Sequence, residues 1–241
     1  MAFITVNGQI YTPGLAIINA PQPYTPLGGE TLQISIDVSG NGQLSLSPED
    51  DAPTLFHDLT IFLTSTETEK NLTISNGTTT TTNSTAYIGP VLDLEPSSTV
   101  KHINWIWPEC FVGEGDGDGD SSSSSARGNY NISMHQSFRW NGTEYYTVFD
   151  LPISVSNGIE EDEGERVDCA VLENEWRPGV SAASNGSLLG QPWVDGDGGN
   201  VVIVDNEEEE EDGGGSGGGR VKGVGVLGWV VVGLVMGGVI L

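Results

Sequence analysis

The sequence predicts an all-β fold, an antiparallel β-sandwich that occupies residues 1–156. Several segments of this half alternate apolar and polar residues with a period of two, which is typical of strands with one buried face. Gly, Pro and Asn separate these segments, and none of them carries the 3.6-residue apolar stripe of an amphipathic helix. About seven short strands divided by such turns indicate two sheets packed face to face.

Three segments have the clearest strand pattern. Residues 31–38 place four aliphatic side chains on one face, and residues 59–64 alternate in the same way. A third segment places Ile103, Trp105 and Trp107 on one side, opposite polar side chains. Because consecutive strand residues point to opposite faces, we expect these three large side chains to lie in the core.

A β-hairpin is predicted at the end of this domain. Two extended runs, residues 130–140 and residues 145–155, flank Asn141-Gly142. Asn-Gly between two alternating runs is the strongest short signal for a hairpin with a tight turn. Pro152 in the return run predicts an edge strand or a bulge, because proline donates no hydrogen bond to a neighbouring strand.

The chain has two cysteines, Cys110 and Cys169. In an oxidising compartment they would form a disulfide that closes a loop of about 60 residues and stabilises the fold by about 4 kcal/mol in the chain-entropy model. The alternative is two separate buried thiols. The compartment that the glycosylation sequons indicate favours the disulfide.

Acidic residues dominate the charge and are concentrated in blocks. Asp and Glu total 34 against 8 Lys and Arg, which gives a formal net charge of −26. Residues 114–120, 160–175 and 195–212 hold 21 of the 34 acids. Like charges repel and stay solvated, so we expect a disordered acidic loop at 113–127 and an acidic, Gly-rich stalk at 157–212. The absence of a Lys/Arg stripe argues against nucleic acid as a partner.

The C-terminal segment, residues 213–241, predicts attachment to a membrane. A Gly/Ser run at 213–219 precedes a short polar spacer and eighteen uncharged residues from 224 to 241. This order is typical of the signal for a glycosylphosphatidylinositol (GPI) anchor, in which small residues mark the attachment point. The candidates for that point are Gly214, Gly215 and Ser216. The alternative is a transmembrane helix, since eighteen residues just span a bilayer core of about 30 Å.

Asn-X-Ser/Thr sequons indicate a glycoprotein of the secretory pathway. The chain has six of them, where chance alone would give roughly two or three. Three crowd into a Thr-rich stretch that predicts an exposed, sugar-bearing loop. The six asparagines are Asn71, Asn76, Asn83, Asn131, Asn141 and Asn185. No N-terminal signal peptide is recognisable; we interpret this as a leader missing from the sequence, and we expect the protein at the outer side of the plasma membrane.

The sequence predicts no metal site, no cofactor and no catalytic site. The acidic run at 116–120 does not match a calcium-binding EF-hand loop, because Ser121 and Arg127 occupy the positions that require Gly and Glu. No Gly-X-Ser-X-Gly nucleophile motif is present. The histidines have no metal-ligand spacing and are expected on separate strands: His57, His102 and His135. We therefore predict that the protein is not an enzyme.

Aromatic residues at the hairpin tip are candidates for stacking against sugar rings. Trp140 and Tyr145 flank the predicted turn, so we expect both side chains to be exposed. A ring that is apolar on its face and polar at its edge suits a surface of this kind.

One stretch resembles a known structural family. Gly128-Asn-Tyr130-Asn-Ile132, directly before the hairpin, is similar to the F–G region of immunoglobulin-like and fibronectin-type domains. The resemblance covers about thirty residues and implies an immunoglobulin-like sandwich with Tyr130 as its corner tyrosine. Ile132 stands where antibody domains have their second intersheet cysteine, so the resemblance implies that this disulfide is absent.

Most of residues 7–156 also resembles a family of poorly characterised fungal proteins that are secreted or GPI-anchored at the cell surface. The stretches that carry this resemblance are Asn7–Leu15 (NGQIYTPGL), Pro26–Leu32 (PLGGETL) and Tyr145–Pro152 (YYTVFDLP). The resemblance implies a location and an architecture, and it brings no activity with it.

Together these features predict a non-enzymatic cell-surface glycoprotein that serves in adhesion, in wall organisation or as a binding scaffold. The expected partners are the membrane, through the C-terminal lipid anchor or helix, and wall polysaccharide or other surface proteins. Two alternatives stay open. One is a carbohydrate-binding module for wall polysaccharide, and the other is a small secreted hydrolase.

Overall fold

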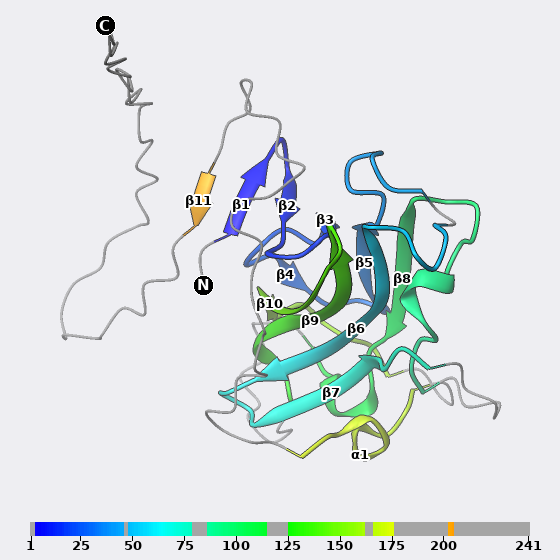
Figure 1. Cartoon of the computed structure of the whole chain (residues 1–241). Coiled ribbons are helices and arrows are strands. Elements are labelled where there is room, and N and C mark those ends of the chain that lie inside the picture. Colours follow the sequence, from blue (N-terminus) through cyan, green and yellow to red (C-terminus); the bar gives the residue numbers. More distant parts are fainter. Residues whose placement is uncertain are drawn as a thin grey trace, which may run out of the picture. The chain divides into compact units, whose positions relative to one another are not determined.

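A computed structural model describes residues 3–45, 48–78, 86–114, 125–161, 166–175 and 202–204. Over these ranges the chain forms two β-sheets, with a few short helices between strands (Figure 1). The helices are η1 (Val91–Asp93) and η2 (Glu109–Phe111), both 3-10, and α1 (Cys169–Leu172). The all-β class predicted from the alternating segments is therefore confirmed.

Sheet A has six strands within the described residues. In spatial order they are β11 (Val202–Val204), β1 (Phe3–Val6), β2 (Gln9–Tyr11), β3 (Ile17–Ala20), β5 (Thr31–Asp37) and β8 (Val100–Ile106). Neighbouring strands are antiparallel, and an irregularity between Ile18 and Ala20 shifts the register of β3 on β5.

Sheet B has five strands in the described part of the chain. In spatial order they are β4 (Pro26–Leu27), β10 (Thr143–Val155), β9 (Gly128–Trp140), β6 (Leu55–Ser65) and β7 (Lys70–Ser75). They are antiparallel except for β4, which runs parallel to β10. The long β9–β10 hairpin and β6 lie side by side in this sheet (Figure 1).

The two sheets bury a common hydrophobic core. Sheet A contributes Ile34 from β5 and Ile103 and Trp105 from β8, all at most 2% exposed. Sheet B contributes Ile132 from β9, which is fully buried. The predicted alternation places these side chains inward, because residues two apart in a strand share one face. Trp107 is also fully buried, so both tryptophans of this segment lie in the core as expected.

An aromatic row runs through the core. The ring centroids of Trp105 and Trp107 are 5.9 Å apart, and those of Trp107 and Phe111 are 5.3 Å apart. Phe111 in turn lies 5.3 Å from Tyr130. Tilted and edge-to-face ring pairs stabilise a core beyond the burial of their area. The row connects β8, η2 and β9, and it positions η2, which carries Cys110.

The β9–β10 hairpin turns at Asn141-Gly142, as predicted. Both residues have positive φ, 48° and 78°, which is the conformation that a two-residue type I′ turn requires. β10 is a sheet edge along most of its length, because β4 pairs only with Ser154 and Val155. Pro152 lies in the part that β4 leaves unpaired, in agreement with the predicted edge position.

The loop between β2 and β3 is held against sheet B by Gln136, a fully buried residue of β9. The side-chain oxygen of Gln136 accepts a hydrogen bond from the backbone N–H of Ala16 at 2.9 Å. Its side-chain nitrogen donates to the hydroxyl of Thr12 at 3.0 Å. Gly14 lies against the same amide and leaves no room for a side chain. This clamp joins segments that are 120 residues apart in the chain.

Packing against the core continues past residue 156, where the sequence predicts the stalk to begin. Ile159, Cys169 and Leu172 are at most 5% exposed, and Ile159 pairs with Gly113 in an isolated bridge. The remaining parts of the predicted acidic loop, stalk and C-terminal segment lie outside the described residues: 115–124, 162–165, 176–201 and 205–241.

Candidate functional site

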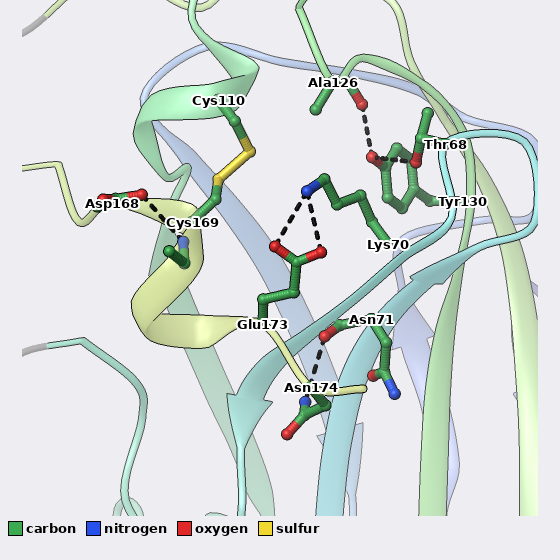
Figure 2. A network of polar contacts seen from close by, with 11 residues as sticks. Thr68, Lys70, Asn71, Cys110, Ala126, Tyr130, Asp168, Cys169, Glu173 and Asn174 are labelled. Atoms are coloured by element: carbon green, nitrogen blue, oxygen red, sulfur yellow. Dashed lines mark hydrogen bonds and ion pairs between the residues drawn. A yellow bond between two sulfur atoms is a disulfide. The ribbon is translucent and has the colours of Figure 1, made fainter. Parts of the chain in front are cut away.

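The predicted disulfide joins η2 to α1. Cys110 and Cys169 are bonded, with their Cα atoms 6.0 Å apart and a sequence separation of 59. Asp168 begins α1, and its carboxylate accepts a hydrogen bond from the backbone N–H of Ala170 at 2.9 Å. Figure 2 shows this bond beside the disulfide. The disulfide therefore anchors residues 166–175, which we name the clasp, to η2.

Polar contacts also join the clasp to strand β7 (Figure 2). The ammonium of Lys70 binds both carboxylate oxygens of Glu173, at 3.0 and 3.1 Å. The backbone N–H of Asn174 donates to the carbonyl oxygen of Asn71 at 2.8 Å, and its side chain donates to the hydroxyl of Thr73 at 3.0 Å. The clasp thus covers the outer edge of β7, where a strand otherwise exposes unpaired backbone groups.

Tyr130 lies next to the clasp and makes two hydrogen bonds through its hydroxyl. It donates to the carbonyl oxygen of Ala126 at 2.5 Å, four residues upstream, and it lies 2.8 Å from the hydroxyl of Thr68 (Figure 2). Burial raises the pKa of Tyr130 to about 12. The phenol is therefore locked in its neutral form and joins the start of β9 to the β6–β7 turn.

Two of the predicted glycosylation sites share the outer face of sheet B. Thr64 of β6 pairs with Asn71 of β7 on one side and with Asn131 of β9 on the other. The three residues form one row across three strands, and neighbouring strands lie about 4.8 Å apart. Both asparagines are partly buried. The side-chain oxygen of Asn71 is buried, and within the described residues nothing donates a hydrogen bond to it.

Two further sites lie at turns. Asn76 follows β7, and its side-chain oxygen accepts hydrogen bonds from the N–H and the hydroxyl of Thr78, at 3.0 and 2.8 Å. This Asx turn does not use the amide nitrogen, the atom that carries the sugar in an N-glycoprotein. Asn141 is exposed at the tip of the β9–β10 hairpin. Asn83 and Asn185 lie outside the described residues.

The hairpin aromatics pack against a second, smaller hydrophobic cluster. Its buried members are Tyr11, Leu15, Ile17 and Phe138. Trp140 and Tyr145 are partly buried against this cluster, whereas the sequence suggests exposed rings. The ring of Tyr145 stacks on Phe138, with centroids 5.5 Å apart and planes inclined by 13°. One face of the Tyr145 ring is therefore covered by Phe138 and is not available to a sugar. Residues of β1–β3 pack against this end of the hairpin in the same cluster.

The three histidines have three separate sets of partners. His57 lies 2.6 Å from Glu144, and His102 lies 3.0 Å from Glu95. His135 lies 2.6 Å from the hydroxyl of Tyr146. Among the residues that the structure describes, no group of three or more His, Cys, Asp or Glu side chains is placed to hold a metal ion.

His135 is part of a polar cluster on the outer face of sheet B. Burial lowers its pKa, and Asp150 partly opposes this effect. Its second ring nitrogen lies 3.3 Å from the hydroxyl of Ser133, which is only 5% exposed. A serine nucleophile must reach a substrate carbonyl, and Ser133 lies too deep in the sheet surface to do so. The cluster satisfies its own polar groups.

A small pocket lies where the loop before β6 meets β8. Its volume is about 90 Å³, room for a few water molecules, and its walls include Val38, Leu55 and Phe56. Lys101 also lines it, and the Lys101 ammonium donates to the carbonyl oxygens of Leu94 and Glu95. Burial lowers the pKa of Lys101. The lysine serves to tie η1 to β8.

The ion pair at the clasp has little signal in the sequence, whereas the clamp formed by Gln136 has a clear one. Glu173 belongs to an acid block that reads as solvated, yet it binds Lys70 at a distance of 103 positions in the chain. Gln136 does have a signal, because it is a polar residue at an inward position of an alternating strand. A polar residue at such a position predicts a buried hydrogen-bonding partner.

The segment predicted to attach the protein to a membrane, residues 213–241, is not among the described residues. Gly214, Gly215 and Ser216 lie outside the described residues. Among the described residues, no helix has the length and apolar character that a membrane span requires.

Comparison with known proteins gives no relative for the chain. Neither a protein-family model nor a curated protein nor a solved structure matches it.

Proposed function

We propose that this chain is a cell-surface glycoprotein without enzymatic activity, a scaffold for adhesion or wall organisation. Its β-sheet domain would be the ectodomain, and residues 213–241 would attach it to the membrane through a GPI anchor. The observation that carries the proposal is the distribution of sequons around a disulfide-bonded domain. Asn71, Asn76, Asn131 and Asn141 all lie on sheet B or at its turns, outside the hydrophobic core.

An immunoglobulin-like domain is part of this proposal. The hydroxyl of Tyr130 donates to a backbone carbonyl four residues upstream at the start of a long strand. A conserved tyrosine in immunoglobulin-like sandwiches makes a bond of this kind at the corner that precedes strand F. The two-sheet core without an intersheet cysteine pair is compatible with the wider group of such domains.

No observation favours the hydrolase alternative. The Ser133–His135 pair is the nearest approach to a nucleophile and base among the described residues, and its serine is buried. Carboxylates are plentiful, but a glycosidase needs two of them facing each other across a cleft. The cavity described above is lined mainly by apolar side chains and by Lys101.

Cell-surface release tests the proposal. The full chain would be expressed in a fungal host with the genomic codons upstream of Met1 retained, and intact cells would be treated with phosphatidylinositol-specific phospholipase C. We expect release of a protein whose mass falls after treatment with peptide N-glycosidase. A variant without residues 224–241 is the matched control, and we expect it in the medium without lipase.

Occupancy of each sequon is read in the same experiment. Asn76→Gln and Asn141→Gln should each lower the mass by one glycan. Unglycosylated protein in the cytosol would overturn the proposal. Protein that is glycosylated but needs detergent for extraction, even after removal of an acyl group from the inositol, would replace the lipid anchor by a transmembrane segment.

A further inference from the structure

The outer face of sheet A carries a set of amide and hydroxyl side chains on four adjacent strands. We define this amide face by its five residues: Gln9 on β2, Asn19 on β3, Gln33 and Ser35 on β5, and Asn104 on β8. Their neighbours along the strands point inward to the core, so the five side chains point outward. Figure 1 shows β2, β3, β5 and β8 side by side in this order.

The register places these side chains next to one another. Gln33 and Asn104 are directly paired across β5 and β8. Asn19 lies in the irregular part of β3 beside Ser35. The side-chain amide of Gln9 donates a hydrogen bond to the side-chain oxygen of Asn19 at 2.9 Å. Neighbouring strands are about 4.8 Å apart and alternate residues along a strand are about 6.8 Å apart. These spacings are close to the size of a sugar ring.

Two amides at the centre of this face, those of Gln33 and Asn104, lie side by side and are exposed. No residue of the described part of the chain forms a hydrogen bond with either side chain. On the outer face of sheet B, part of the polar groups bond to one another, although the side-chain oxygen of Asn71 receives no hydrogen bond from the described residues. Ser133, His135 and Tyr146 form one such chain. At the centre of the amide face, the side chains of Gln33 and Asn104 therefore offer adjacent open donors and acceptors among the described residues.

Charge distinguishes the amide face from the rest of the molecule. None of its five residues is acidic or basic, although the chain has a net charge of −26. His102 lies opposite Ser35 and is exposed, and its ring pairs with the carboxylate of Glu95, so one ion pair borders the neutral residues. A strongly acidic protein repels an anionic polymer, and a basic partner would go to the acid blocks. A neutral ligand is neither repelled by the acidic protein nor drawn to the acid blocks.

We propose that the amide face binds a neutral polysaccharide. Each Asn or Gln amide offers both donors and an acceptor, which pair with the hydroxyl groups of a sugar. A protein partner is disfavoured, because protein interfaces depend on large apolar or aromatic anchors and the face offers only Ile106, which is 40% exposed. The four sequons within the described residues lie on sheet B or at its turns, away from the strands that carry this face.

Binding by one molecule is expected to be weak, since no aromatic ring lies on the face to stack on a sugar. A dense array of copies on a surface and a polymer of repeating sugars would strengthen it through effective concentration. The inference rests on the proposed function in one respect: the protein must be at the cell surface to encounter a polysaccharide. The binding itself is independent of the anchor and can be measured on purified protein.

The test uses the full chain, purified in detergent and immobilised at high density on beads. The probes are fluorescent mannan, β-1,3-glucan and dextran as neutral polymers, and polygalacturonate as an acidic one. We expect retention of at least one neutral polymer and no retention of polygalacturonate. The double variant Gln33→Ala/Asn104→Ala should weaken that retention about tenfold or more.

Two further variants make the outcome specific. Gln33→Glu/Asn104→Asp keeps the shape and removes the amide donors, so it should weaken retention at least as much as the alanine pair. Thr60→Ala/Ser137→Ala, on the outer face of sheet B, is the matched control and should bind as the wild type does. Thermal unfolding confirms that all variants fold.

Three results would overturn the inference. The first is no retention of any neutral polymer by a folded wild-type protein. The second is retention that both amide-face variants leave unchanged. The third is retention that Trp140→Ala or Tyr145→Ala abolishes while the amide-face variants do not, which would assign binding to the hairpin tip. Failure of lipase release with intact binding would reject the anchor and leave the amide face supported.

Discussion

The hydroxyl of Tyr130 donates a hydrogen bond to the carbonyl oxygen of Ala126, which precedes it by four residues. This contact closes the turn directly before β9. The pairing of β9 with β10 is the longest in sheet B within the described residues. The ring also packs on Phe111, next to the half-cystine Cys110. One side chain therefore connects the start of β9, the aromatic row and the disulfide.

Tyr130→Phe should destabilise the fold by about 1 to 3 kcal/mol, because it leaves the partly buried carbonyl of Ala126 without this donor. The measurement is urea unfolding of the full chain at pH 8. Tyr146→Phe, which removes a hydroxyl from the outer face of sheet B, is the matched control and should cost less. Equal losses for the two variants would contradict the role assigned to Tyr130.

The same variant should change the response to alkali. Burial raises the pKa of Tyr130 to about 12 in the folded protein, above its ordinary value of 10.0. Between these pH values the unfolded chain has lost the proton and the folded one keeps it, so stability falls as pH rises. The loss is complete above the folded pKa and amounts to about 3 kcal/mol. Unfolding free energies measured from pH 9 to pH 12 should fall more steeply for the wild type than for Tyr130→Phe.

Removal of the disulfide should cost much more than removal of the nearby ion pair. Cys110→Ala/Cys169→Ala opens a loop of 59 positions and should lower the unfolding free energy by about 4 kcal/mol. Glu173→Gln breaks a pair whose side chains are 26% and 35% exposed, and such pairs contribute about 1 kcal/mol or less. Urea unfolding of both variants gives the comparison. Two titratable thiols in the unreduced wild-type protein would reject the disulfide.

Gly14 and Gln136 should show energetic coupling. Gly14→Ala places a methyl group against the clamped Gln136 amide and should cost about 1 to 3 kcal/mol. Gln136→Ala removes two buried hydrogen bonds but also makes room for that methyl group. The double variant should therefore be more stable than the sum of the single losses predicts. Strict additivity in a double-mutant cycle would show that the two residues do not meet as described.

His135 should make the protein less stable in mild acid. Burial lowers its pKa in the folded state, so below its ordinary value of 6.5 the unfolded chain takes up a proton that the folded protein refuses. Stability is therefore full above that value and falls with pH until the folded His135 is protonated as well. His135→Gln should show a weaker loss between pH 7.5 and pH 5. His102→Gln, at an exposed position, controls for the replacement of a histidine, and an identical acid response in all three proteins would contradict the prediction.

Local pattern predicted much of the fold. The alternation around Ile34 and Ile103 predicted which side chains are buried, because the period of a strand is two and only one face meets the core. Asn141-Gly142 predicted its hairpin because few residues tolerate positive φ at both turn positions. The sequence also predicted that the two cysteines pair, and Cys110 and Cys169 are bonded in the structure. The oxidising compartment that favoured this pairing stays a prediction.

The arrangement of the candidate site could be predicted from the sequence only in small part. The packing of Tyr145 on Phe138 depends on β1–β3 leaning over the hairpin, and no local pattern reports that arrangement. The amide face likewise needs the strand order β2–β3–β5–β8, since its residues come from four separate segments. Predictions for Asn83, Asn185 and residues 213–241 concern parts of the chain outside the described residues, and they remain predictions.

The sequence by itself determined the class of fold, the inward face of each long strand and the tight turn of the hairpin. These depend on neighbours two to four residues apart, where backbone geometry alone decides which side chains share a face. Tertiary structure decided that Glu173 binds Lys70, that Gln136 clamps the β2–β3 loop, and that five amide and hydroxyl side chains meet on one face. Those outcomes depend on which strands become neighbours, and strand order follows from the burial of the whole apolar surface rather than from any one segment.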